Sequence, residues 1–235
     1  MPFANDRPSR GSTTLELTVR PEQLRSALAQ GLDLPLTALR ASMEALNRTL
    51  PVDTNTGGVL EGALEEVNRL GRNVRELMEF TAQPDPMPMR CSATEIVASA
   101  RDSLPSEVRE RVFAAHVSCD LPLETDAPIL ARSLGRVLEN ALESGSEEVL
   151  VVVRQENDTT SFAVVDGSPA NFDCQWAMSA FHSTKQSHLG LGLAITERDV
   201  TLLNGTLAFE RSELGETCVT ITVPDHFSST ASAQA

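Results

Sequence analysis

The chain has 235 residues, 41% of them hydrophobic, and a formal net charge of −14. The length fits one large or two modest domains with a real core. The charge argues against nucleic acid and anionic membranes as partners, because a nucleic-acid-binding protein gathers Lys and Arg against phosphates. No apolar run reaches the roughly 20 residues of a membrane-spanning helix, and residues 1–13 are polar, without a signal-peptide core. We therefore expect a cytoplasmic protein with no membrane segment.

Two periodic runs near the start of the chain predict a helical hairpin. Apolar residues recur every three or four positions over residues 21–50, which is the repeat of one helix face. Pro35 interrupts this run, and we expect a kink there because a mid-helix proline removes a backbone donor. A polar turn over residues 51–58 leads to a second periodic run over residues 60–78. Two such helices joined by a short turn pack against each other.

The apolar seam of this hairpin predicts a dimer. Neither helix can bury the whole seam alone, so we expect two chains to pair as a four-helix bundle. The alternative is a hairpin that packs only on the second domain of its own chain. The seam consists of Leu24, Leu28, Leu39, Met43, Leu46, Leu60, Leu64, Val67 and Val74.

Beyond a stiff Pro-rich linker, helices mixed with mainly antiparallel strands predict an α/β sandwich. Ser92 and Glu95 form a capping-box pattern, and Asp126 can cap a second helix that runs to about Ser144. We expect strands over 112–119, 149–153, 162–166, 206–211 and 218–223, a long loop over 167–189 and a helix over 190–203. The predicted organisation is an arm over residues 1–20, a dimerisation hairpin over 21–80, a linker over 81–90, the sandwich over 91–224 and a disordered tail over 225–235.

Three features in chain order predict a nucleotide site in the sandwich. Asn140 lies on a helix, where its amide oxygen could reach a magnesium ion. Asp166 ends a strand and could accept a hydrogen bond from the amino group of a base. Gly190 and Gly192 open a helix whose N-terminal N–H groups favour phosphates, and Lys185 could add positive charge. Each feature alone also has an ordinary structural explanation, such as a turn residue. The predicted ATP-binding residues are Asn140, Asp166, Gly167, Lys185, Gly190 and Gly192.

The order and spacing of these features resemble the ATP-binding domain of the two-component histidine kinases, a fold shared with the gyrase and Hsp90 ATPases. The hairpin is similar to the dimerisation and phosphoacceptor domain of that family, with Pro35-Leu-Thr37 matching its signature. The resemblance covers about residues 20–224 and implies ATP and magnesium as ligands. The similar segments are residues 134–141 for the asparagine box, 165–170 and 190–194 for the two glycine boxes, and 181–185 for the phenylalanine box.

The hairpin departs from the family at its reactive position. Gln30 stands where the resemblance places the phosphoacceptor histidine, and a neutral amide lacks the ring nitrogen that attacks a γ-phosphoryl group. Gly31 replaces the acidic neighbour, and Leu34 replaces the residue used in the phosphatase reaction. Arg136 stands one turn before Asn140, where the family has Asn or Glu. We therefore predict no catalytic residue in the hairpin and no autophosphorylation.

We interpret the chain as a dimeric, histidine-kinase-like binding and regulatory module that acts through a partner. The resemblance implies a response-regulator receiver domain or a partner histidine kinase as that partner. One alternative is an active kinase that phosphorylates a histidine of another protein, or a weak ATPase. Another is a phosphotransfer-like adaptor that has lost nucleotide, which Ser168 and Ala170 in place of family glycines would favour. The expected partner surface carries Gln30, Asp33, Leu34, Thr37 and Arg40.

Overall fold

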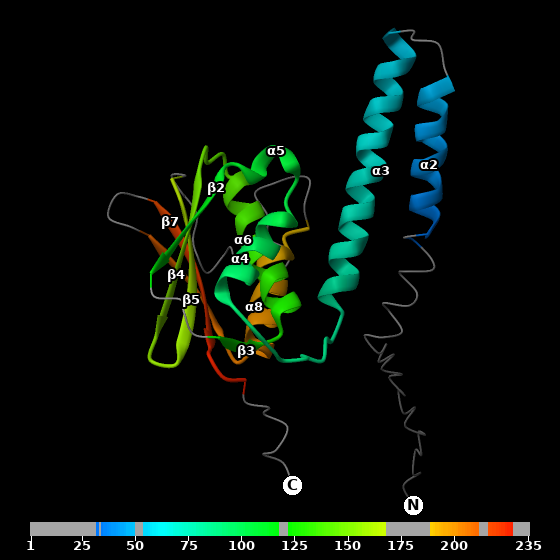
Figure 1. Cartoon of the computed structure of the whole chain (residues 1–235). Coiled ribbons are helices and arrows are strands. Elements are labelled where there is room, and N and C mark those ends of the chain that lie inside the picture. The colour runs from blue at the N-terminus through cyan, green and yellow to red at the C-terminus, as the bar shows by residue number, and fades with distance from the viewer. Residues whose placement is uncertain are drawn as a thin grey trace, which may run out of the picture.

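The computed structural model describes residues 32, 34–49, 54–117, 122–167, 189–211 and 216–227. A pair of helices stands beside an α/β unit and joins it at one end (Figure 1). No helix in these ranges is both long and apolar enough to cross a bilayer. In chain order the elements are α2 (Leu34–Thr49), α3 (Thr54–Phe80), β1 (Met89–Cys91), α4 (Ala93–Asp102), α5 (Ser106–Arg109), β2 (Val112–Val117), β3 (Leu123–Thr125), α6 (Ala127–Glu143), β4 (Val149–Glu156), β5 (Thr159–Asp166), α8 (Gly192–Leu202), β6 (Thr206–Arg211) and β7 (Thr217–Pro224).

Helices α2 and α3 pack together as the predicted hairpin. Helix α3 begins at Thr54. The turn predicted over residues 51–58 is therefore too long, because residues 54–58 are helical. Gly58 is helical, at a propensity cost of about 1 kcal/mol that a long, packed helix can offset. Pro35 is the second residue of α2, and Leu32 before it is π-helical. Apart from Leu32, the residues before α2 on which the predicted kink depends lie outside the described part.

The hairpin of one chain buries only part of the predicted seam. Among the seam residues with described side chains, Val67 is buried, whereas Leu39 and Leu46 are 48% and 50% exposed. Leu24 and Leu28 lie outside the described residues. The half-buried members are Met43, Leu60, Leu64 and Val74.

The α/β unit is the predicted two-layer sandwich. Its five-stranded sheet has the order β2-β4-β5-β7-β6, and only the β2–β4 pair is parallel. Helices α4, α6 and α8 cover one face of the sheet (Figure 1). Strands β4 and β5 are longer than predicted because Asn157 and Asp158 turn the chain with φ of 53° and 58°, as in a two-residue hairpin turn.

The core lies between the sheet and these helices, where Phe162, Leu130 and Leu134 are fully buried. Both predicted helix caps that begin this layer are confirmed. Ser92 and Glu95 form a reciprocal capping box at the start of α4. The Asp126 carboxylate accepts a hydrogen bond from the backbone N–H of Ile129 at the start of α6.

Residues at both edges of the sandwich are ordered where the sequence suggested linker or tail. Asp225, placed in the predicted tail, is buried and accepts a hydrogen bond from the Thr160 hydroxyl at 2.7 Å. Its carbonyl accepts the backbone N–H of Glu124 at 2.8 Å. Met89 and Arg90, placed in the predicted linker, pair with β3 in a second, two-stranded sheet. Residues 228–235 of the predicted tail lie outside the described residues.

Candidate functional site

Asn140 on α6 lies close to Gly192 at the start of α8, and both are predicted nucleotide-binding residues. Asn140 is half-buried on α6. A Cβ atom placed on Gly192 would lie 4.0 Å from the Asn140 Nδ2 atom, so the glycine leaves the space beside this amide open. Gly190 has a φ of 72°, a conformation that favours glycine. Packing of α6 on α8 therefore brings together two segments that are distant in the sequence.

The first turn of α8 has no capping side chain among the described residues. Leu191 occupies the N-cap position and provides no side-chain hydrogen bond to the first turn. The first turn also contains no acidic residue. The first N–H groups of a helix have no partner within the helix and carry its positive dipole end. These groups can therefore donate to the oxygens of an anionic ligand.

Asp166 lies beside a buried hydroxyl that sequence reasoning did not select. Asp166 ends β5 and is 7% exposed, and Thr217 is its cross-strand neighbour on β7. The Thr217 Oγ1 atom is buried and has no hydrogen-bond partner within the described residues. Leaving such a group unpaired costs about 1–3 kcal/mol, which a ligand or a water that bonds to it removes. The signal in the sequence was the position of Thr217 at the start of the closing strand.

Of the other predicted site residues, Gly167, Thr37 and Arg40 have described surroundings. Gly167 is exposed, and a Cβ atom placed on it would meet nothing within 4 Å. Thr37 and Arg40 are exposed on α2, and the Arg40 Nε atom donates to Glu44 at 3.0 Å. Gln30, Asp33 and Lys185, as well as the side chain of Leu34, lie outside the described part.

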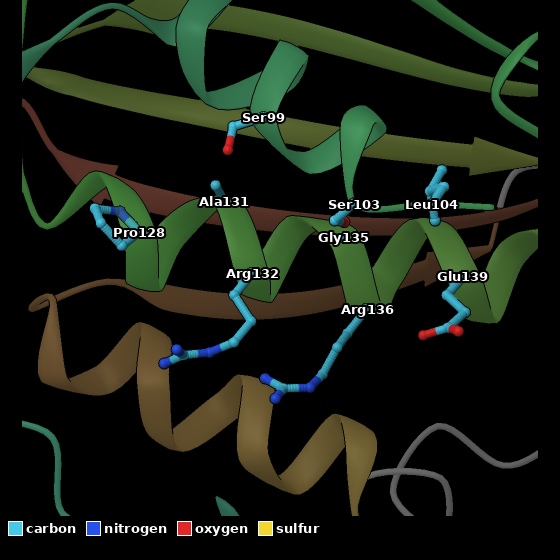
Figure 2. Close-up of a pocket in the computed structure, with 9 residues that line it drawn as sticks. All are labelled: Ser99, Ser103, Leu104, Pro128, Ala131, Arg132, Gly135, Arg136 and Glu139. Carbon is cyan, nitrogen blue, oxygen red and sulfur yellow. The ribbon is translucent and has the colours of Figure 1, made fainter. Parts of the chain in front are cut away.

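Arg136 belongs to a group of charged residues that joins α3 to the α/β unit, here called the docking cluster. The Glu79 carboxylate of α3 pairs with Arg136 and, at 3.3 Å, with Arg132, both on α6. Asp199 of α8 is fully buried and lies 3.4 Å from Arg132 and 3.6 Å from Arg136. Arg198, the fifth member, bonds to Asp199 at 2.5 Å. Figure 2 shows Arg132 and Arg136 extending from α6 toward α8.

Arg198 also terminates α3. Its Nη1 atom donates to the carbonyls of Glu79 at 2.7 Å, Phe80 at 2.9 Å and Ala82 at 2.8 Å. The last carbonyls of a helix have no partner within the helix, so a guanidinium at that end is stabilising. Arg198, in the middle of α8, thus contributes to the junction with the hairpin.

A pocket of about 400 Å³ lies along α6 on the side of α4 (Figure 2). It contains none of the predicted nucleotide-binding residues. A Cβ atom on Gly135 would lie 2.8 Å from the Ser103 Oγ atom, so α4 and α6 pack closely at its floor. The pocket is therefore a different feature from the predicted nucleotide site. Its lining residues are Ser99, Ser103, Leu104, Pro128, Ala131, Arg132, Gly135, Arg136 and Glu139.

Comparison with known proteins agrees with this geometry. Residues 125–226 match the family described as histidine kinase-, DNA gyrase B-, and HSP90-like ATPase. The C4-dicarboxylate transport sensor protein DctS of Rhodobacter capsulatus is 24% identical over 217 residues, which are 86% of this chain and 33% of DctS. Residues 125–226 therefore carry the ATPase domain of this family, and most of the chain is similar to two-component histidine kinases. It spans about a third or less of the length of the curated relatives that it matches.

Solved histidine kinase structures share the fold. Full-length ShkA in complex with AMPPNP has a TM-score of 0.71 at 21% identity, over 88% of this chain and 46% of that chain. The histidine kinase ThkA in complex with the response regulator protein TrrA has a TM-score of 0.62 at 15% identity, over 88% of this chain and 64% of that chain. Because the identities are 21% and 15%, these similarities show that this chain has the same fold, and no more.

Proposed function

We propose that this histidine kinase relative binds ATP with magnesium, does not phosphorylate itself, and regulates a partner as a dimer. The observation that carries nucleotide binding is the Asp166–Thr217 pair, a buried carboxylate beside a buried hydroxyl without a partner in the described residues. Together these two groups suit a base that both donates and accepts hydrogen bonds. The ShkA structure with AMPPNP supports the same ligand class.

The remaining residues fit the polyphosphate end of such a ligand. Gly190, with a φ of 72°, and Gly192 lie at the start of α8, whose first N–H groups can donate to phosphates. The Asn140 side chain carries an amide oxygen, a hard ligand of the kind magnesium prefers, and its amide nitrogen would lie 4.0 Å from a Cβ atom on Gly192. Lys185 adds a positive charge from the preceding segment of the sequence.

Nucleotide binding is tested by a calorimetric and a fluorescence titration of the full chain with Mg–ATP. Trp176 is the only tryptophan and there is no tyrosine, so the emission reports on the segment between Asp166 and Gly190. We expect heat of binding and a change of emission with a common midpoint. Titrations that stay flat at millimolar nucleotide would remove the proposal and favour the adaptor alternative.

Gln30 and Arg136 argue against autophosphorylation. Gln30 cannot act as the nucleophile. Arg136 lies one turn before Asn140, where the family has Asn or Glu. Its guanidinium pairs with Glu79 and Asp199 and is therefore engaged in the docking cluster. The alternative of a kinase acting on another protein's histidine is distinguished by transfer of labelled phosphate from ATP to candidate partners.

The open seam supports a homodimer. Leu39, Leu46 and Leu70 are 48%, 50% and 42% exposed in the single chain. Fully burying one leucine contributes about 1.5–3 kcal/mol, so covering several half-exposed ones can offset the cost of association. The second copy is the natural cover because its own seam has the same character.

We predict that Leu39→Asp raises the dimer dissociation constant by about tenfold, because an unpaired charge would be buried in the seam. Ala38→Asp, at an exposed neighbouring position on α2, is the matched control and should leave the dimer intact. Light scattering measures both. A native protein that is monomeric at micromolar concentration would exclude the dimer.

The exposed face of the hairpin is the proposed contact for a response-regulator receiver domain or a partner kinase. The ThkA–TrrA complex shows that one protein of this fold engages a response regulator. Thr37 and Arg40 are exposed on α2, at a spacing that puts them on one helix face with Gln30, Asp33 and Leu34 if the helix extends back.

We predict that reversing both charges, Asp33→Arg with Arg40→Asp, weakens capture of the partner by about tenfold while sparing dimerisation and nucleotide binding. The control reverses two exposed charges of α3 at the same spacing, Glu65→Arg with Arg72→Glu. Surface-bound protein titrated with purified receiver domains gives the affinities. Equal affinities for the native protein and the first double variant would place the contact elsewhere.

A further inference from the structure

A carboxylate of α3 reaches the glycine turn that precedes α8. The backbone N–H of Leu189, one residue before Gly190, donates to Glu76 Oε2 at 3.3 Å. Leu189 is half-buried and lies three residues before Gly192, the first residue of α8. The hairpin therefore places an anion just before the N–H groups of α8 that we assign to the phosphates.

The docking cluster explains why Glu76 sits there. Glu79 follows Glu76 by three residues, so both side chains share one face of α3. The pairs of Glu79 with Arg132 and Arg136 hold this face against α6, and Arg198 binds the carbonyls at the end of the helix. The fully buried Asp199 ties Arg198 to the arginines of α6. Any motion that separates the end of α3 from α8 must withdraw Glu76 as well.

We propose that Glu76 is a built-in competitor of nucleotide phosphate, so that docking of α3 on α8 and binding of a polyphosphate oppose each other. The inference rests on the proposed nucleotide function and adds its regulation. The Leu189 N–H cannot donate fully to both the Glu76 carboxylate and a phosphate oxygen. A phosphate bound at the start of α8 would also be repelled by the nearby Glu76 carboxylate. Because coupling between two binding events is reciprocal, docking weakens nucleotide binding by the same factor by which bound nucleotide weakens docking.

The first test compares Mg–ATP affinities of the native chain and Glu76→Gln. Glutamine keeps the size and an accepting oxygen but removes the charge, so affinity is expected to rise by about three- to tenfold at moderate ionic strength. Glu65→Gln removes an exposed carboxylate elsewhere on α3 and serves as the matched control, with no change expected. The gain should shrink as salt is added, because screening weakens the repulsion.

The second test follows amide hydrogen exchange at the end of α3. The N–H groups of Thr81 and Ala82 bond to the carbonyls of Leu77 and Glu79, both at 3.1 Å, and report on this last turn. Saturating Mg–ATP should speed their exchange in the native chain. In Glu76→Gln the exchange should already be faster without nucleotide and should change less when it is added.

The outcomes separate this inference from the proposed function. Equal Mg–ATP affinities for the native chain and Glu76→Gln, with unchanged exchange in α3, overturn the competition while nucleotide binding stands. Flat titrations for both proteins overturn the proposed function and the competition together. Binding seen only with Glu76→Gln supports both, with Glu76 as an effective internal inhibitor.

Discussion

Asp199→Ala is expected to lower the free energy of unfolding by about 3–5 kcal/mol, the usual cost of removing one partner from a buried ion pair. Asp199 is fully buried. Its carboxylate oxygens lie 2.5 Å from the Arg198 Nη2 atom and 3.6 Å from the Arg136 Nη1 atom. The Arg136 side chain is only 14% exposed, so water compensates for little of the lost carboxylate. Arg132 is 42% exposed and its pair contributes little to this total.

Urea unfolding of the purified variants measures this loss. Asp199→Asn keeps the shape and one accepting oxygen and should lose less than alanine does. Glu197→Ala, at an exposed carboxylate two residues earlier on α8, is the control and should change the unfolding free energy by less than about 0.5 kcal/mol. A loss below about 1 kcal/mol for Asp199→Ala would contradict the structural role that we give to the docking cluster.

Asp166→Ala is expected to weaken Mg–ATP binding by about a hundredfold, near the upper end of the 1–3 kcal/mol cost of leaving a buried group unpaired. The reason is that Asp166 is the acidic acceptor at the buried end of β5, beside Thr217. Thr217→Val removes the neighbouring hydroxyl and should weaken binding as well, but by less, because the carboxylate remains.

Calorimetry with Mg–ATP gives these affinities, and the Trp176 emission confirms them independently. Asp102→Ala, which removes an exposed carboxylate at the end of α4, is the matched control. Far-ultraviolet circular dichroism should be the same for all variants. An Asp166→Ala variant that binds as tightly as the native chain would move the base-binding end of the site elsewhere.

Local sequence patterns predicted the elements well because their causes are local. The Ser92–Glu95 capping box and the Asp126 cap depend only on residues within one helical turn. The sandwich itself followed from the alternation of elements and the resemblance to histidine kinases. The first residues of α3 were missed because a polar, glycine-containing stretch reads as a turn when its packing against α2 is unknown.

The parts that sequence reasoning missed depend on contacts between distant segments. Thr217 becomes a candidate only through its register with Asp166 on the neighbouring strand. The partners of Arg136 come from α3 and α8, so its substitution was visible in the sequence but its role was not. Asp225 resembled a tail residue because its partner Thr160 is far away in the chain.

The central claim is that this histidine kinase relative holds ATP without transferring its phosphate to itself. The most direct measurement incubates the native chain with magnesium and γ-labelled ATP, and counts label retained on a filter before and after denaturation in detergent. We expect label to be retained by the native protein and lost completely on denaturation. Label that stays on the denatured chain would show autophosphorylation, and no retention by the native protein on an unwashed, rapidly drained filter at saturating nucleotide would show that nucleotide is not held. Either result would contradict the account.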